Sequence, residues 1–263
     1  MLSPKVKILG AGVLAGILLG ASPFVLKIQA VEKSAVASSS EFSEAQKAEL
    51  NSLMKDFILN NPTVILDSVN NHQKNQAQAQ EEQGTKALAE FKDFFYKSDE
   101  LPSVGNKSAD ITIVEFFDYN CGYCKRAFEA VQDTLNKDKN IRFVFVDLPI
   151  LSEQSHDAAQ LALAAQLQGK YFELHKGLML FQGPKTRDNI LKVAKDAGLD
   201  TARLEADAKS PKVQDLLKKN AEVAQKLAIT GTPAFVLGDQ IVRGFIPGDA
   251  MQTMIKDLRA KKG

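Results

Sequence analysis

Cysteine is scarce in this sequence: 263 residues contain only two, and both lie in one segment, Cys121-Gly-Tyr-Cys124. A protein held together by disulfides has an even number of cysteines spread along its length. A bridge within such a short loop would constrain the unfolded chain very little. The two cysteines are therefore predicted to do chemistry, and a purely structural disulfide is the weaker alternative.

Histidine is also rare. His72, His156 and His175 are the only three, and they lie far apart in the sequence, whereas a zinc site needs about four ligands. A haem-attachment motif would require histidine at position 125, which is lysine. No metal or other cofactor is therefore expected. His156 and His175 are expected to be surface histidines or hydrogen-bonded core histidines.

An excess of charge of one sign is missing as well. The formal net charge is +1, with 44% hydrophobic and 25% charged residues. A phosphate-binding surface normally shows a clear basic excess, so nucleic acid is not an expected partner. The composition is that of a globular protein with room for a sizeable core and for two domains.

The N-terminus has the features of a secretory signal, predicted over residues 1–37. Lys5 and Lys7 precede an almost uninterrupted apolar run, 8–26, and a small-residue pattern follows at 35–37 (Ala-Val-Ala). A run of about 19 apolar residues could also span a bilayer, so a retained membrane anchor is the alternative to a cleaved signal. Both interpretations predict export, into a compartment where disulfides form and persist.

Residues 41–98 are predicted to form a helical module followed by a linker helix. Apolar side chains recur there at three- and four-residue spacing, which predicts one apolar stripe formed by Leu50, Leu53, Met54, Phe57 and Ile58. Asn61 and Pro62 predict the N-cap and first residue of a second helix. Residues 70–86 are almost wholly polar, which is typical of a helix that bridges between domains.

This module is too short to bury both of its faces alone. Self-association through residues 41–98, as a homodimer or a homotrimer, would bury the apolar stripe. The alternative is that these helices fold back on the main domain.

From residue 100 the pattern changes to that of an α/β domain, predicted over 100–263. Two strands flank a helix and are predicted to be parallel because the helix supplies the crossover. The expected order is strand, helix, strand, long helical insert, hairpin and final helix, at 111–119, 121–136, 141–148, 153–228, 234–243 and from about 247.

The two cysteines lie where the first strand of this domain leads into a helix. A helix N-terminus offers unpaired N–H groups and a positive dipole, which together stabilise a thiolate at Cys121. With two residues between them, Cys124 can reach back to form or resolve a disulfide. A thiolate at Cys121 could attack a substrate disulfide, and Cys124 could then break the mixed disulfide.

Three segments carry a family resemblance. Residues 115–125 (Glu-Phe-Phe-Asp-Tyr-Asn-Cys-Gly-Tyr-Cys-Lys) resemble the active-site segment of thioredoxin-fold proteins of the DsbA family. Residues 231–235 (Gly-Thr-Pro-Ala-Phe) resemble the family's cis-proline loop, and 244–248 (Gly-Phe-Ile-Pro-Gly) its lead into the final helix. The N-terminal helical region is similar to that of the oligomeric exported subgroup that includes ScsC-type proteins. The resemblance implies a thioredoxin-like fold with a long helical insertion, preceded by a helical oligomerisation module.

The resemblance also implies roles for individual residues. Cys121 would be the nucleophile and Cys124 the resolving thiol of a redox-active disulfide. Pro233 would be a cis-proline facing that disulfide, and the backbone of Thr232 would pair with bound peptide. Glu115 matches the family's buried acid, which could shuttle protons to Cys124. Strand alternation places Glu115 on the same face of its strand as the apolar Ile113 and Phe117, and so predicts its burial.

The dipeptide between the cysteines, Gly122-Tyr123, departs from the Pro-His of the DsbA oxidases. Without an imidazole beside it, Cys121 is expected to be less acidic and the disulfide less oxidising. Gly-Tyr, and threonine before the cis-proline, are similar to the DsbC-type disulfide isomerases. Both residues of the dipeptide are expected to contact substrate.

The expected function is that of an exported protein disulfide oxidoreductase with isomerase or mixed isomerase/oxidase activity on envelope or secreted proteins. A net dithiol oxidase is the alternative, and a non-catalytic chaperone or surface interaction protein is a third possibility. The implied location is the periplasm or cell envelope of a Gram-negative bacterium, with a membrane redox partner.

Overall fold

The computed structural model describes residues 42–261, so the predicted signal or anchor segment lies outside the described residues. The chain divides into two compact units, one ending at Asn60 and the other beginning at Asn61. The described part of the first unit contains helix α1 (Glu44–Asn60), none of whose residues is buried. Among residues 42–261, no helix combines the length and the hydrophobicity that crossing a membrane requires.

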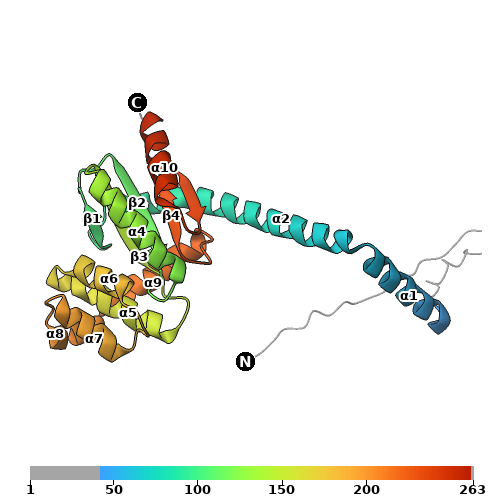
Figure 1. Cartoon of the computed structure of the whole chain (residues 1–263), viewed down its shortest axis with the longest axis horizontal. Coiled ribbons are helices and arrows are strands. Elements are labelled where there is room, and N and C mark those ends of the chain that lie inside the picture. The colour runs from blue at the N-terminus through green and yellow to red at the C-terminus, as the bar shows by residue number, and fades with distance from the viewer. Residues whose placement is uncertain (1–41, 262–263) are drawn as a thin grey trace, which may run out of the picture. The chain divides into compact units, whose positions relative to one another are not determined.

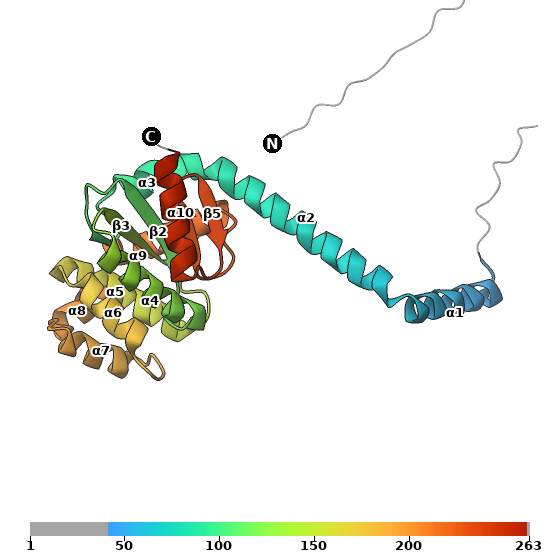
Figure 2. The same cartoon turned by 45° about the horizontal axis from the view of Figure 1, so that its top comes forward.

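The second unit begins with helix α2 (Pro62–Leu88), which starts with Asn61 as N-cap and proline at its first position, as predicted. The helix continues without interruption through the polar stretch 70–86. Only Gly84 and Leu88 are buried along it, and Figures 1 and 2 show its earlier turns extending away from the sheet.

The last turns of α2 join the core of the second unit. The Arg243 guanidinium donates from Nη2 to the Gln80 carbonyl at 3.0 Å. A Cβ at Gly84 would lie 2.7 Å from the Leu227 carbonyl oxygen, so glycine permits this close approach. A short 3₁₀ turn (Ala89–Phe91) and helix α3 (Lys92–Tyr96) follow, and Phe95 of α3 is fully buried.

A five-stranded mixed sheet forms the centre of the second unit, in the order β1-β3-β2-β4-β5. Strands β2 and β3 are parallel, as predicted, and the other pairs are antiparallel. The strands are β1 (Ser103–Gly105), β2 (Ile111–Phe117), β3 (Ile141–Asp147), β4 (Ala234–Leu237) and β5 (Gln240–Arg243). Every residue of β3 is buried, which explains why five of its seven residues are apolar.

Helices cover the sheet and form the insert. Helix α4 (Gly122–Lys137) is the crossover between β2 and β3, and it packs against α10 (Gly248–Ala260). The insert is helical, as predicted, and Figures 1 and 2 show α5 to α8 grouped together beside α4. Its helices are α5 (Glu153–Ala165), α6 (Tyr171–Leu180), α7 (Arg187–Asp196), α8 (Thr201–Ala208) and α9 (Pro211–Lys226), with a 3₁₀ turn at Gln166–Gln168.

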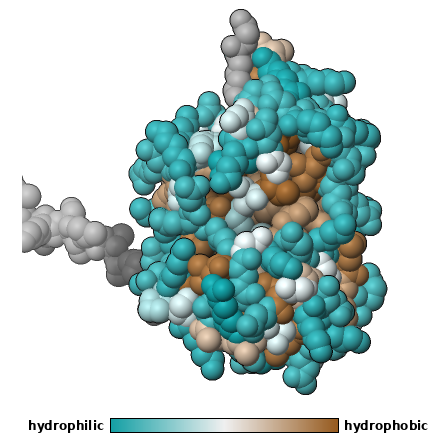
Figure 3. Space-filling view, turned by 90° about the vertical axis from the view of Figure 1, so that its left-hand side faces the viewer, coloured by the Kyte–Doolittle hydropathy of each residue, from teal (hydrophilic) through white to brown (hydrophobic). Residues whose placement is uncertain are grey.

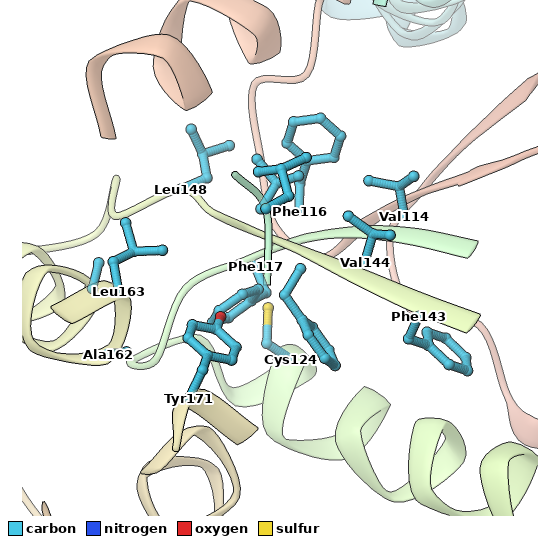
Figure 4. Close-up of a cluster of buried hydrophobic side chains, with 14 of the residues drawn as sticks. Val114, Phe116, Phe117, Cys124, Phe143, Val144, Leu148, Ala162, Leu163 and Tyr171 are labelled. Atoms are coloured by element: carbon cyan, nitrogen blue, oxygen red, sulfur yellow. The ribbon is translucent and has the colours of Figure 1, made fainter. Parts of the chain in front are cut away.

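The core of the second unit lies between the sheet and these helices. Figure 4 shows Cys124 of α4 with its sulfur directed toward the strands, near Phe117 and Tyr171. One face of the molecule is mostly hydrophilic, with hydrophobic side chains showing between the hydrophilic ones, chiefly in the middle and along one edge (Figure 3). Cys124 is fully buried and belongs to this hydrophobic core.

Candidate active site

The loop between β2 and α4 is held in place by the carboxylate of Asp118. Its Oδ1 accepts from the backbone N–H of Asn120 at 2.7 Å, and its Oδ2 accepts from Ile150 and Leu151 at 2.9 and 3.1 Å. Asp118 also accepts at its carbonyl from the N–H of Cys121, at 3.1 Å. These bonds fix the chain as it leaves the sheet and make Cys121 the N-cap of α4.

The same loop is tied to the helical insert. The Asn120 side-chain amide donates to the hydroxyls of Ser152 and Ser155, at 3.1 and 2.9 Å. The Tyr119 hydroxyl and His175 Nδ1 are hydrogen bonded at 3.1 Å. Burial lowers the pKa of His175 to about 3, so its imidazole is neutral. The position of Cys121 therefore depends on hydrogen bonds between its loop and residues that lie 32 to 56 positions further along the chain.

The two cysteines occupy very different environments, and both are free thiols in this structure. A hydrogen bond from Cys124 and the donors around Thr232 and the helix start lower the pKa of Cys121 to about 5, against the opposing effect of burial. Burial raises the pKa of Cys124 well above its usual value, helped by its hydrogen bond to Cys121 and by the charge of Glu115. Near neutral pH, Cys121 is therefore a thiolate and Cys124 a thiol.

Cys121 is less accessible than an exposed nucleophile, because only 7% of its surface is exposed. Cys124 is fully buried. Gly122, the next residue in the chain, is exposed. A Cβ at Gly122 would meet no atom within 4 Å, which leaves space for a bound chain.

The loop before β4 lies against Cys121. The Thr232–Pro233 peptide bond is cis, as the resemblance implies, and the Cys121 thiol donates to the Thr232 carbonyl at 3.2 Å. The Thr232 hydroxyl is buried without a hydrogen-bond partner and is among the groups that lower the pKa of Cys121. Residues that are 111 positions apart thus meet at one sulfur.

Glu115 is buried, as predicted, with 1% of its surface exposed. It lies in the centre of β2, opposite Phe145 of β3 and Phe235 of β4. Burial raises its pKa to about 8, and the negative charge of Cys121 adds to the effect. Its Oε1 has no hydrogen-bond partner. A carboxyl group that titrates near neutral pH can accept and return a proton.

Tyr123 forms an exposed rim beside the cysteines, with 59% of its surface accessible. The Arg126 guanidinium lies 5.6 Å from the centre of its ring and 4.8 Å from that of Phe245. Ile150 and Leu151, which donate to Asp118, are also exposed. An apolar surface therefore borders the redox pair.

Some contributors could not be found from sequence patterns. Asp118 and Asn120 adjoin the motif, but their partners lie 32 to 35 residues away. His175 is a hydrogen-bonded core histidine, one of the two expected outcomes, and His156 is exposed. No group of three or more metal-binding side chains occurs within residues 42–261.

A Cys-x-x-Cys pair at a helix N-terminus, next to a cis-proline loop at the end of a mixed sheet, defines the thioredoxin fold. Residues 112–258 match the DSBA-like thioredoxin domain family. A thioredoxin-like oxidoreductase from Silicibacter pomeroyi DSS-3 is 41% identical, with a TM-score of 0.62 over 65% of this chain and 98% of the other. The chain belongs to the DSBA-like thioredoxin domain family.

The N-terminal region has its own relatives. Residues 46–79 match the N-terminal domain of the copper resistance protein ScsC. A linker-deletion mutant of Proteus mirabilis ScsC is 28% identical, with a TM-score of 0.65 over 85% of this chain and 100% of the other. The thiol-disulfide exchange protein alpha-DsbA2 from Wolbachia pipientis is 26% identical, with a TM-score of 0.62 over 66% and 95%.

Curated relatives share only part of their length with this chain. A Na(+)/H(+) antiporter NhaA 1 from Salinispora arenicola is 28% identical over 153 residues, which are 57% of this chain and 24% of that protein. The chain thus spans about a quarter of the length of the curated relatives that it matches.

Proposed function

We propose that this protein is an exported, homo-oligomeric enzyme that rearranges disulfides in envelope or secreted proteins, as an isomerase or a mixed isomerase/oxidase. The observation that carries the proposal is the opposite shift of two thiol pKa values, lowered at Cys121 and raised at Cys124. A thiolate at Cys121 attacks at neutral pH, whereas Cys124 keeps its proton. The mixed disulfide therefore survives long enough for a thiol of the substrate to attack it.

In the first step, the Cys121 thiolate attacks one sulfur of a substrate disulfide. A bond forms between Cys121 and that sulfur, the substrate S–S bond breaks, and the other substrate sulfur leaves as a thiolate. In isomerisation, a different substrate thiolate then attacks the mixed disulfide. A new substrate disulfide forms and Cys121 leaves as a thiolate, with no net oxidation.

Attack by Cys124 on the mixed disulfide, which is called resolution, competes with isomerisation as the second step. Glu115 in its carboxylate form takes the proton of Cys124, and the resulting thiolate attacks the Cys121 sulfur. The Cys121–Cys124 disulfide forms, and the substrate sulfur leaves as a second thiolate. The substrate disulfide is thereby reduced and the enzyme dithiol oxidised. Run in reverse, the same steps oxidise a substrate dithiol.

Four residues around the pair are assigned to substrate binding. The open space beside Gly122 admits a chain, and the exposed ring of Tyr123 offers an apolar contact. The backbone of Thr232, before cis-Pro233, lies beside the reacting sulfur and pairs with the bound peptide. Exposed apolar side chains suit clients that are not yet folded, because such clients expose their own apolar residues.

Self-association through residues 41–98 is part of the proposal. Helix α1 has no buried residue, and Leu50, Leu53 and Ile58 are exposed by 44%, 60% and 47%. The start of α2 adds further exposed apolar residues, including Leu66 at 61%. Assembly as a dimer or trimer would bury these side chains and bring several redox sites together. The ScsC-type match over 46–79 supports this assignment.

The N-terminal charge and apolar pattern supports export to the periplasm or cell envelope of a Gram-negative bacterium, with or without a retained anchor. A membrane redox partner would then keep Cys121 and Cys124 in the state that the reaction needs.

A net dithiol oxidase is the second candidate, because a Cys121 pKa of about 5 makes this sulfur a good leaving group. Reactivation of scrambled ribonuclease by the reduced full-length protein separates the two functions. The proposal expects reactivation at a rate that exceeds the oxidation of a reduced dithiol peptide by the disulfide form. Rapid peptide oxidation without any reactivation would replace the isomerase by the oxidase.

A further inference from the structure

A cavity of about 430 Å³ opens at the end of the sheet where β2 begins. It is remote from the redox pair, because Cys121 follows the other end of β2 and the intervening strand is roughly 20 Å long at about 3.3 Å per residue. Arg142 of β3 lines this cavity, next to Thr112, its register partner on β2.

Arg142 is an unusual residue for this position. It interrupts the apolar sequence of a strand that is buried throughout, and only 8% of its own surface is exposed. Its Nη1 donates to the Tyr96 carbonyl at 3.2 Å, whereas its buried Nε has no partner. Among residues 42–261, no carboxylate forms an ion pair with it. A buried guanidinium that lacks a counter-ion is costly, and an anion in the cavity would relieve that cost.

The charged residues that line the cavity carry a net positive charge, because three are basic and two are acidic. Lys107, at the rim, has no hydrogen bond or ion pair within the described part of the chain. The two acidic residues of the lining are already engaged: Asp239 pairs with Lys92 at 3.0 Å, and Asp110 is held in a two-point pair by Arg259. Arg142 and Lys107 therefore remain available to an incoming ligand.

The cavity also has an apolar part. Ile111 and Leu258 line it together with Tyr96, whose hydroxyl donates to the Gly238 carbonyl at 3.4 Å. The volume is in the range of sites that take small molecules. The lining thus combines two cationic donors with an apolar wall.

We propose that this cavity is a binding site for a small organic anion. Its oxyanion group, a carboxylate or a phosphate, pairs with Arg142 and Lys107, and its apolar part packs against Ile111 and Leu258. An arginine fork matches the geometry of either oxyanion. The site is separate from the thiol chemistry and uses none of its residues.

Equilibrium dialysis of the full-length protein tests this proposal at constant ionic strength. The probes are benzoate, phenyl phosphate and the neutral benzyl alcohol, which share an aromatic ring and differ in charge. We expect one saturable site per chain for benzoate or phenyl phosphate, at least about tenfold tighter than for benzyl alcohol. The tighter of the two anions identifies the oxyanion. Equal, weak binding of all three probes would overturn the proposal.

Variants locate the site. Loss of a charge-assisted hydrogen bond should weaken binding by about ten- to a hundredfold in Arg142→Met. Lys107→Met, at an exposed position that cannot disturb the core, should weaken it several-fold and decides the matter if Arg142→Met does not fold. Lys195→Met, an exposed lysine of α7, is the matched control and should bind normally. Unchanged binding in Lys107→Met, or an equal loss in Lys195→Met, would refute the site.

Alkylation of Cys121 provides a second control. The modified protein should bind the anion as tightly as the unmodified protein, because the cavity lies at the opposite end of β2. A loss of binding on alkylation would place the anion at the redox site and overturn the proposal.

Discussion

The sulfur of Cys121 lies 3.2 Å from the carbonyl oxygen of Thr232, so the first residue of the redox motif contacts the residue that precedes the cis-proline. The Thr232 hydroxyl is buried nearby without a partner. It becomes a useful donor once Cys121 loses its proton, because a thiolate accepts hydrogen bonds more strongly than a thiol.

Replacing Thr232 by valine should therefore make Cys121 less acidic. Removal of one hydrogen bond to a charged group, about 1.5 kcal/mol or more, corresponds to a rise of about one unit in the pKa of Cys121. Alkylation rates measured between pH 4 and pH 9 report this pKa. Thr230→Val, two residues earlier and exposed, is the matched control and should leave the profile unchanged. A profile for Thr232→Val that coincides with the control would refute the role of the hydroxyl.

Glu115→Gln should slow resolution without slowing the first attack. Glutamine cannot take the proton of Cys124, and general-base contributions of this kind are worth about a hundredfold or more in rate. Stopped-flow measurements on a model disulfide should show a normal first phase and a mixed disulfide that accumulates. Glu129→Gln, on the exposed face of α4, should behave as the unmodified enzyme. Normal resolution in Glu115→Gln would exclude this residue as the proton acceptor.

The same residue should make stability depend on pH. The pKa of Glu115 is raised to about 8 in the folded state from about 4.3 in an unfolded chain. The unfolded state alone releases this proton between those values, so the free energy of unfolding should fall as pH rises from about 5 to 8. Urea unfolding at pH 5 and pH 8 should show a smaller loss for Glu115→Gln. An equal loss in both proteins would contradict the assigned pKa.

Asp147 should add to this loss, because burial also raises its pKa to about 8 although the Tyr171 hydroxyl donates to its Oδ2. His175 acts in the opposite direction. Its pKa is lowered to about 3, so stability is lost as pH falls below about 6.5, where the unfolded chain binds the proton. Stability should therefore be greatest at mildly acidic pH.

Tyr119→Phe tests the tie between the active-site loop and the insert. It leaves His175 without its partner in the core, at a cost of about 1–3 kcal/mol in the free energy of unfolding. Tyr123→Phe removes a hydroxyl from an exposed ring and should cost almost nothing. Urea unfolding of both variants measures the difference. Equal stabilities would show that the Tyr119–His175 hydrogen bond does not hold the loop.

Substituting polar residues into the apolar stripe of α1 should prevent the chains from self-associating. Leu53→Gln combined with Ile58→Gln reduces the apolar area that a second chain would cover, and Lys55→Gln on the same helix is the control. Light scattering should give two or three times 28.7 kDa for the unmodified full-length chain and the control, and 28.7 kDa for the double variant. The double variant should reactivate scrambled substrate more slowly than the unmodified protein, but it should still reduce a small-molecule disulfide at the normal rate. A 28.7 kDa unmodified protein would refute the assembly.

The sequence predicts those parts of the fold that local patterns encode. Apolar runs identify β2, β3, β4 and β5, and the last two together span the predicted hairpin, 234–243. Strand β1 was missed because three residues, Ser103–Gly105, are too few to show alternation. Its pairing with β3 depends on residues about 40 positions away.

The candidate site shows the same division. Cys121 and Cys124 are predictable from their spacing at a strand-to-helix junction, whereas Glu115 and the cis-proline are implied by the resemblance of their segments to the family. The bonds from Asp118 to Ile150 and from Tyr119 to His175 join distant segments. These pairs are set by the tertiary packing, which brings together segments that lie more than 30 positions apart.

The order of the two cysteines is the central claim, and trapping the mixed disulfide tests it most directly. Reduced Cys124→Ser and Cys121→Ser are each incubated with scrambled ribonuclease, quenched in acid and analysed by mass spectrometry without reduction. Cys124→Ser should accumulate a covalent adduct through Cys121, and Cys121→Ser should form almost none. An equal or greater adduct in Cys121→Ser would contradict the account.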